Sequence, residues 1–361
     1  MSESDKVAGG NVGEWSEVYV FFRLLGDHEI FACDENLNRT DESFPILKIF
    51  RGQVKESTVI CTYDEVRDSW DVYSGASEIV NVLSSEGKSE ADNLLALLKN
   101  KDKWPGKYSK AAKFLSRLNI DGIKADSQKK QDIVLKISDV RAGTAPTCGF
   151  SIKSYLGKAP TLLNSSGDCT NFLYEAEGIS VDKIEKLNEL DKIESIIQAI
   201  EEQGGKLIFK GCCRDVFSMN LEQIDTSAEK ILGELVRLHY SGKGKSIKEV
   251  TGLLMEANPF QFLNPRTYKM VVKRLLDTVA LGMTPGHDWN GETDRTNGII
   301  IVKTDGEVVT YHIYNRDAFK QYLYMQTRFE RPSRSRHKYG KLYEESGKVC
   351  IKLALQIRFN G

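Results

Sequence analysis

Gln-Asp-Ile-Val-Leu-Lys-Ile at residues 131–137 and Gly-Phe-Ser-Ile-Lys-Ser at residues 149–154 are two short runs with the composition of β-strands. The stretch between them, 138–148, is rich in turn-forming residues, so the two runs can pair across a wide loop. Asp132 would then head one strand and Lys153 would lie inside the next. A carboxylate that binds Mg²⁺ beside an ammonium group that aligns water is typical of a metal-dependent phosphodiesterase core.

This candidate site lacks one acid. Ser151 occupies the position two residues before Lys153, where the usual nuclease pattern has a carboxylate. Mg²⁺ takes oxygen ligands and often only one or two carboxylates, so we expect Asp132 and the backbone carbonyl of Ile152 among them. The acid that replaces the missing one stays open between two pairs. One pair, three residues apart on a predicted N-terminal helix, is Glu14 and Glu17, and the other, downstream of the lysine, is Asp168 and Glu175.

Composition places the chain among ordinary soluble proteins. It has 361 residues, 40% hydrophobic and 28% charged, with a net charge of -1, so a polyanion would have to bind a local basic patch. Seven cysteines without a CxxC pair argue against a zinc module and a disulfide framework. No apolar leader and no run of 18 apolar residues is present. We therefore expect a cytoplasmic protein that does not enter membranes.

Periodicity gives a coarse order of elements. A first helix is predicted from Gly13, because Trp15, Val18, Phe22 and Leu25 share one face. The further helices are expected at 77–100, 107–119, 180–203, within 220–283 and at 317–324. Strands are expected at 28–33, 44–51, 56–63, 170–175 and 206–210, in a hairpin of 299–302 with 308–314, and in one alternating strand at the end of the chain.

Several longer strings carry a resemblance to a known family. They are Gly-Glu-Trp-Ser-Glu-Val-Tyr at 13–19, the run at 149–154, Thr-Leu-Leu-Asn-Ser at 161–165, Thr-Asn-Phe-Leu-Tyr-Glu at 170–175, Tyr-His-Ile-Tyr-Asn-Arg-Asp-Ala-Phe at 311–319, Ser-Arg-His-Lys-Tyr-Gly-Lys-Leu-Tyr at 335–343 and Leu-Gln-Ile-Arg-Phe at 355–359. Together and in this order they resemble the HpaII family of type II restriction endonucleases over nearly the whole chain.

The resemblance implies a Mg²⁺-dependent endonuclease that cuts double-stranded DNA at the palindrome CCGG, between the two cytosines, leaving a two-base 5′ overhang. It implies an α/β (α+β) fold: a PD-(D/E)XK nuclease core with a mixed β-sheet flanked by helices, and a C-terminal α+β region. Asp132 matches the first acid of that motif, Ser151 its variable acid and Lys153 its lysine. The string at 13–19 favours Glu14 or Glu17 as the replacement acid, whereas a likeness to other enzymes that cut CCGG-containing sites favours Asp168 or Glu175.

The chain is expected to be organised in two regions. Residues 1–220 would form the nuclease core, with the N-terminal helix and the strands of Asp132, Ser151 and Lys153, and residues 221–361 a helical and β-hairpin region for DNA recognition and dimerisation. Two symmetric cuts in a palindrome are most simply made by a homodimer. The resemblance also implies a companion cytosine methyltransferase that protects host DNA.

Sequence reading of DNA is expected near the C-terminus. Residues 328–341 carry six Arg or Lys against one acid, and arginine can bond guanine bidentately. The polar face of the last predicted strand would touch DNA as well. The expected DNA-binding residues are Arg334, Arg336, His337, Lys338, Gln356 and Arg358. The alternative for this segment is a mobile basic loop. The alternatives for the whole protein are a protein that binds specific DNA without cutting it and a structure-specific nuclease.

Overall fold

The structure is a computed structural model that describes residues 10–51, 58–120, 122–123, 131–139, 143–292, 297–312 and 316–360. Parts of three expected segments lie outside these ranges: 140–142 of the loop, 56–57 of a strand and 313–314 of the hairpin. The described residues divide into two compact units. Unit 1 is drawn from residues 1–160 and 294–319, and unit 2 from residues 161–293 and 320–360.

Each unit is built from separate stretches of the chain, and strand pairing joins them. The late strand β11 (Gly298–Val302) pairs with β7 (Thr147–Ser154) in unit 1. In unit 2, β9 (Asn171–Glu177) pairs with β15 (Lys348–Ala354) near the end of the chain. The assignment of recognition and dimerisation to the C-terminal region remains a prediction.

Unit 1 is built on a mixed sheet. Its strands, as far as the described residues show, run in the order β1-β12-β11-β7-β6-β2-β3-β4-β5, with β7 parallel to β11, β1 parallel to β12 and the other neighbours antiparallel. The predicted mixed sheet flanked by helices is thereby confirmed. The remaining bounds are β1 (Glu29–Cys33), β2 (Arg39–Arg51), β3 (Val59–Asp64), β4 (Ser69–Ser74), β5 (Ser77–Leu83), β6 (Ile133–Ile137) and β12 (Val308–His312).

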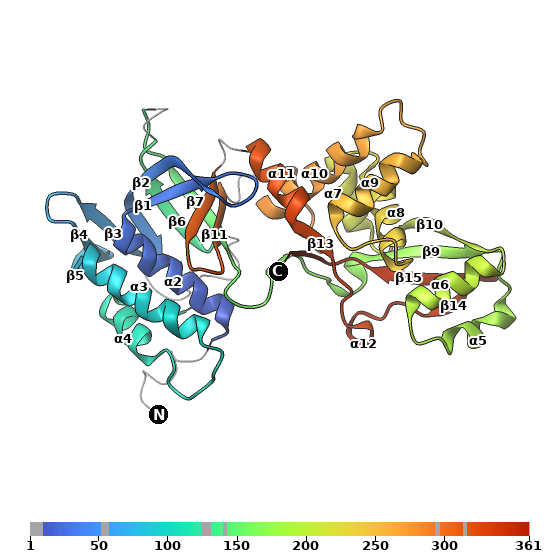
Figure 1. The fold of residues 1–361 in the computed structure, drawn as a ribbon, viewed down its shortest axis with the longest axis horizontal. Coiled ribbons are helices and arrows are strands. Elements are labelled where there is room, and N and C mark those ends of the chain that lie inside the picture. Colours follow the sequence, from blue (N-terminus) through green and yellow to red (C-terminus); the bar gives the residue numbers. More distant parts are fainter. Residues whose placement is uncertain are drawn as a thin grey trace. The chain divides into compact units, whose positions relative to one another are not determined.

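The described helices of unit 1 include α2 (Val12–Asp27), α3 (Ser84–Lys99) and α4 (Ser109–Arg117), of which α2 and α3 run side by side (Figure 1). The predicted first helix is α2, and its apolar face is fully buried at Trp15 and Phe22. Glycine permits the close approach of the two helices. A Cβ on Gly26 would lie 2.8 Å from the backbone of Lys88, and a Cβ on Gly87 would lie 2.8 Å from Leu25.

The helix expected over 77–100 is wrong in its first part. Residues 77–83 form β5, and only Ser84–Lys99 is helical. Ile79, Val80 and Val82 are β-branched and favour extended backbone. The strand β4, which the sequence analysis did not predict, supplies the pairing partner through a turn at Gly75. Local strand preference together with an available neighbour therefore outweighs the helical periodicity.

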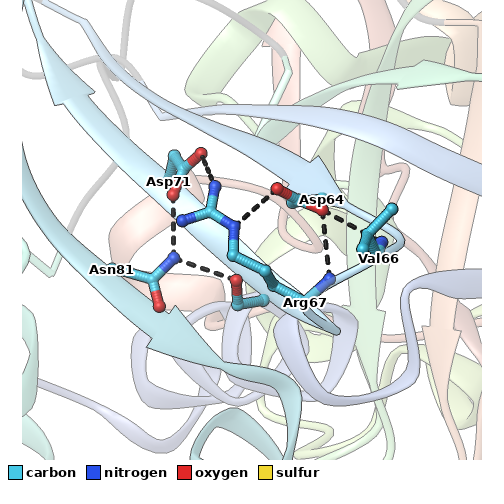
Figure 2. A network of polar contacts seen from close by, with 6 residues as sticks. Asp64, Val66, Arg67, Asp71 and Asn81 are labelled. Atoms are coloured by element: carbon cyan, nitrogen blue, oxygen red, sulfur yellow. Dashed lines mark hydrogen bonds and ion pairs between the residues drawn. The ribbon is translucent and has the colours of Figure 1, made fainter.

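A polar network holds the turn between β3 and β4 (Figure 2). The Arg67 guanidinium donates to Asp64 at 2.6 Å and to Asp71 at 2.7 Å. The Asn81 amide on β5 donates to Asp71 at 2.8 Å and to Ser69 at 2.9 Å. One arginine thus links the ends of two strands, and the asparagine ties the third strand to them.

Unit 2 contains two smaller sheets, of order β10-β9-β15-β14 and β13-β16-β8 in the described residues. The single alternating strand expected at the end of the chain is interrupted after Ala354 and resumes at Ile357. Its two halves pair in different sheets, so they form two strands. The bounds are β8 (Thr161–Leu163), β10 (Lys206–Cys212), β13 (Thr327–Phe329), β14 (Leu342–Glu345) and β16 (Ile357–Phe359).

The helices of this unit are α5 (Ile184–Asn188), α6 (Ile193–Glu202), α7 (Asp215–Ile224), α8 (Ala228–Tyr240), α9 (Ile247–Ala257), α10 (Arg266–Leu281) and α12 (Arg334–His337). The residues of α11 (Arg316–Gln326) are divided between the two units after Phe319. Short 3₁₀ turns lie at Gly167–Thr170 and Val181–Lys183. Among the described helices, none has both the length and the apolar character needed to cross a membrane.

Candidate active site

The register of β6 and β7 brings the acid of one strand to the lysine strand. Ile133 pairs with Phe150, so one further step of the same register places Asp132 opposite Ser151. The Asp132 backbone N–H donates to the Phe150 carbonyl at 2.9 Å. Because side chains two apart share a face of a strand, Lys153 lies on the same side as Ser151. The expected pairing of the two runs therefore places Asp132 and Lys153 on one face.

Hydrogen bonds fix the Asp132 carboxylate against the lysine strand. Its Oδ2 accepts the backbone N–H of Ile152 at 2.6 Å and the hydroxyl of Ser151 at 3.2 Å. The N–H and C=O of a strand residue point toward the same neighbour, so the Ile152 carbonyl faces the end of β6 where Asp132 lies. Ser151 supports the carboxylate by donating to it.

Glu17 on α2 is electrostatically coupled to this site. Burial and the negative charge of Asp132 raise the pKa of Glu17 to about 8, while Arg51 and Lys153 act in the opposite direction. Two carboxylates that are close together with too little positive charge around them repel each other in this way. Glu17 is therefore the acid of the N-terminal helix that shares its surroundings with both Asp132 and Lys153.

Glu14, one turn earlier on α2, has a different role in the structure. Its carboxylate accepts the backbone N–H of Asn11 at 2.9 Å, and the Asn11 side chain accepts the Glu14 N–H at 3.1 Å. This reciprocal pair is a capping box that closes the start of the helix. An oxygen engaged in the cap is less available to a metal ion, so the geometry favours Glu17 over Glu14.

The two downstream acids belong to unit 2 and are paired there with lysines. The Glu175 carboxylate contacts Lys210 at 2.8 Å and Lys348 at 3.0 Å, and hydrogen bonds from these two lysines lower its pKa. The Asp168 carboxylate lies 3.5 Å from the Lys352 ammonium. Both acids thus have local partners. Asp132, in contrast, belongs to unit 1.

Arg51, which sequence reasoning missed, is the buried cation of the site. It ends β2, is only 4% exposed, and donates from Nη2 to the Ile123 carbonyl at 2.8 Å. Its guanidinium carbon also lies 5.3 Å from the centroid of the Phe21 ring. Burial lowers its pKa, and the charges of Glu17 and Asp132 oppose that effect. The one available signal was an arginine directly after the apolar pair Ile49 and Phe50 at the end of the strand.

Asn297, also missed, anchors the lysine strand from its other side. Its backbone N–H donates to the Gly149 carbonyl at 2.7 Å, and its side-chain oxygen accepts the Gly149 N–H at 2.8 Å. These two bonds continue the pairing of β7 with β11 toward its start. Asn297 therefore helps to position the strand that carries Ser151 and Lys153.

The oxygen atoms around Asp132 decide whether this site can hold Mg²⁺. Within the described ranges, no three His, Cys, Asp or Glu side chains lie close enough together to hold a metal ion. Mg²⁺ commonly needs only one or two carboxylates, with other oxygens completing the shell. Asp132, Glu17 and the Ile152 carbonyl are donors of this kind. The pKa of Glu17 is raised first by burial and then by the negative charge of Asp132, and a divalent cation would offset that charge. The residues fit a magnesium ion.

The expected DNA-binding residues belong to unit 2 and differ in their hydrogen bonds and in their exposure to solvent. Arg334 donates to the backbone carbonyls of Asp191 at 2.6 Å and Gly340 at 2.7 Å. The His337 ring accepts the Gly167 N–H at 3.3 Å through Nδ1, and burial lowers its pKa. Gln356 is buried and Arg358 is half-buried on β16. Arg336 and Lys338 are exposed, so they are the two most accessible to a ligand.

A cavity of about 800 Å³ adjoins this segment. Its lining includes Arg334, Lys338, Lys341 and Lys352, with Tyr343 and the acid Asp191. A concave surface with several cations and an aromatic ring is suited to a nucleic-acid backbone. The expected basic segment is thus partly structural, through Arg334 and His337, and partly exposed.

Comparison with known proteins gives a consistent result. The family model described as HpaII restriction endonuclease matches residues 11–359. A curated relative, the type II restriction enzyme HpaII of Haemophilus parainfluenzae, is 38% identical over 363 aligned residues, which cover 97% of this chain and 98% of the relative. No solved structure matches significantly.

Proposed function

This chain belongs to the HpaII restriction endonuclease family, and from that premise we propose that it cuts double-stranded DNA at CCGG between the two cytosines. The family membership makes it a type II restriction enzyme, a site-specific deoxyribonuclease. The recognition sequence, the two-base 5′ overhang and the requirement for Mg²⁺ belong to the proposal. The observation that supports a nuclease site is the Asp132 carboxylate, which accepts hydrogen bonds from the Ile152 N–H and the Ser151 hydroxyl on the strand that carries Lys153.

Asp132, Glu17 and the Ile152 carbonyl would hold the metal ion. Bound Mg²⁺ would act as a Lewis acid toward the scissile phosphate and favour ionisation of a water molecule. The hydrogen bond from Ile152 N–H to Asp132 keeps one carboxylate oxygen fixed and leaves the other to a ligand. Glu17 would lose its proton when a cation binds, since the positive charge stabilises the carboxylate form.

Lys153 would orient the attacking water and offset the charge that develops on the phosphate. Among the described residues its ammonium group makes no hydrogen bond or ion pair, so it is available to the substrate. Ser151 cannot replace a carboxylate as a charged ligand. Its hydroxyl donates to Asp132, and we assign it a positioning role.

We further propose that the enzyme acts as a homodimer on its palindromic site, with a companion cytosine methyltransferase in the same system. A two-fold dimer presents one active site to each strand of a palindrome. Arg336 and Lys338 would contact DNA from unit 2, together with Arg358. The basic segment at 328–341 supports this assignment through its excess of cations.

The decisive test is digestion of an unmethylated plasmid, followed by sequencing of the fragment ends. We expect ends at every CCGG with a 5′ CG overhang in Mg²⁺ and intact DNA in EDTA. A plasmid with each CCGG changed to GGCC is the matched control and should stay uncut. Ends at another sequence would overturn CCGG, and cleavage in EDTA would overturn the metal requirement.

A further inference from the structure

A further cavity lies in unit 1, and the proposed catalytic step does not use it. Its volume is about 740 Å³. Among the described residues, its lining includes four lysines and no acid; the lysines are Lys101, Lys103, Lys107 and Lys158. We refer to it as the lysine cavity. In a chain of net charge -1, four lysines lining one cavity without an acid form a strong local excess of positive charge.

The four lysines divide into two kinds. The Lys107 ammonium donates to the backbone carbonyls of Asn100 at 2.5 Å and Asp102 at 2.9 Å, so it holds the 100–107 segment in shape. Within the described part of the chain, Lys101, Lys103 and Lys158 have no hydrogen bond or ion pair, and all three are exposed. Three ammonium groups are therefore available to an anion.

An exposed aromatic side chain completes the cavity. Trp104 lines it and is 43% exposed, whereas the other three tryptophans of the chain are buried. The Lys107 ammonium lies 5.1 Å from the centroid of the Trp104 ring, which holds the indole beside the cations. Lysines with an adjacent exposed aromatic are the combination that proteins use to hold a nucleic-acid strand.

The lysine cavity adjoins the two elements that carry the candidate active site. Asn11 and Val12, at the start of α2, line the cavity, and Glu17 follows five residues later, about 8 Å along the helix axis. Lys158 follows Lys153 of β7 by the same number of residues. The cavity and the site are thus connected by one short stretch of helix and one short stretch of chain, within the same unit.

We infer that the lysine cavity binds the phosphodiester backbone of the DNA substrate beside the cut, through Lys101, Lys103 and Lys158, with Trp104 against a sugar or base. The inference rests on the proposed function and extends it to a contact surface. Because phosphate contacts carry no sequence information, this surface would bind all duplex DNA with similar affinity. Its contacts would position the strand at Asp132 and Lys153.

The test measures the binding of labelled duplexes in EDTA, where no cutting is expected, at a series of salt concentrations. The variant is Lys101→Gln with Lys103→Gln and Lys158→Gln. The matched control is Lys88→Gln with Lys110→Gln and Lys113→Gln, which removes the same charge from exposed lysines of α3 and α4. One duplex contains CCGG and the other does not.

We expect the cavity variant to bind both duplexes about 10- to 100-fold more weakly than wild type, with a slope of log affinity against log salt that is smaller by about 2–3. The control should retain most of the wild-type slope. An unchanged slope in the cavity variant, or an equal loss in the control, would overturn the inference. Thermal unfolding of both variants checks that each one is folded.

Tryptophan fluorescence gives an independent measurement. Saturating duplex should change the emission of wild type and leave that of Trp104→Phe nearly unchanged, because the other tryptophans are buried. No change in wild type would contradict the inference. If the enzyme fails to cut at CCGG, the proposed specificity is wrong, while binding in EDTA still tests the cavity. If it cuts but the salt slope is unaffected, only the cavity inference is wrong.

Discussion

Glu17 and Glu14 show how one turn of helix separates two chemical roles. Glu14 closes the start of α2 by its bond to Asn11, and Glu17 lies near Asp132, where burial and charge raise its pKa to about 8. The same residue type is therefore structural at one position and a candidate metal ligand at the other. The distinction depends on what packs around each side chain.

A pair of isosteric changes separates these roles. Glu17→Gln should reduce cleavage by at least about 100-fold with little loss of stability, because glutamine resembles the protonated acid. Glu14→Gln should keep cleavage and lose about 0.5–2 kcal/mol from the weakened cap. Cleavage rates at saturating Mg²⁺ and denaturant unfolding check both. If the Glu17→Gln enzyme cuts normally, the replacement acid lies elsewhere, and Asp168→Asn and Glu175→Gln are the next variants to measure.

Lys153 and Asp132 are expected to serve the chemical step. Lys153→Ala and Asp132→Asn should each lower the cleavage rate by about 10³-fold or more while DNA binding stays measurable, because binding energy comes from phosphate and base contacts elsewhere. Single-turnover cleavage and duplex binding check this prediction. A near wild-type rate in either variant would mean that the site is misplaced.

At the scale of elements, the last turn of α8 carries a buried histidine. His239 is 3% exposed, its Nδ1 contacts the Gly244 carbonyl at 2.9 Å, and its ring stacks 5.4 Å from that of Phe329. Burial lowers its pKa to about 4, and the neighbouring charges of Arg331 and Lys245 act in the same direction, against that of Glu330.

His239 therefore links stability to pH. Between about 6.5 and 4 the unfolded chain binds a proton that the folded chain does not, so stability falls as the pH falls, by roughly 2–4 kcal/mol from this group. The unfolding free energy of wild type and His239→Gln, measured from pH 7 to pH 4, checks this. The variant should lose less stability on acidification. Parallel curves would show that His239 does not titrate as stated.

The arginines in and near α12 also differ in their expected roles. Arg334 donates to two backbone carbonyls, so Arg334→Ala should mainly destabilise unit 2. Arg336 is exposed, and Arg358 lies half-buried on β16. We expect at least one of Arg336→Ala and Arg358→Ala to lose about 1–3 kcal/mol of discrimination for CCGG over random duplex. Competition binding with both duplexes measures it. A parallel loss for both duplexes would assign the segment to backbone contacts alone.

At the scale of the whole molecule, symmetry makes a prediction about strand breaks. Wild-type subunits mixed and re-equilibrated with excess Lys153→Ala subunits should form dimers with one working site, which nick one strand of a supercoiled plasmid. We expect open circles to accumulate before linear DNA, whereas wild type alone gives linear DNA. Gel electrophoresis over time checks this. Linear products without open circles in the mixture would contradict a dimer with one site per strand.

Much of the architecture could be read from local patterns. The runs at 131–137 and 149–154 are β6 and β7, and the apolar periodicity from Gly13 is α2, because alternation and helical spacing are properties of neighbouring residues. The long strings at 13–19 and 149–154 carried the family resemblance, because such a resemblance is read from the order of residues alone. Asp132 and Lys153 were candidates for the same reason.

Long-range packing determined the features of the fold and of the site that local sequence patterns did not predict. Residues 77–83 form a strand because β4 is there to pair with them, and the end of the chain forms two strands because its halves pair with different partners. Glu17 is favoured over Glu14 by its neighbours Asp132, Arg51 and Lys153, which lie just before β6, at the end of β2 and in β7. Such preferences depend on burial and on charges far apart in the chain, and only the folded protein brings these charges together.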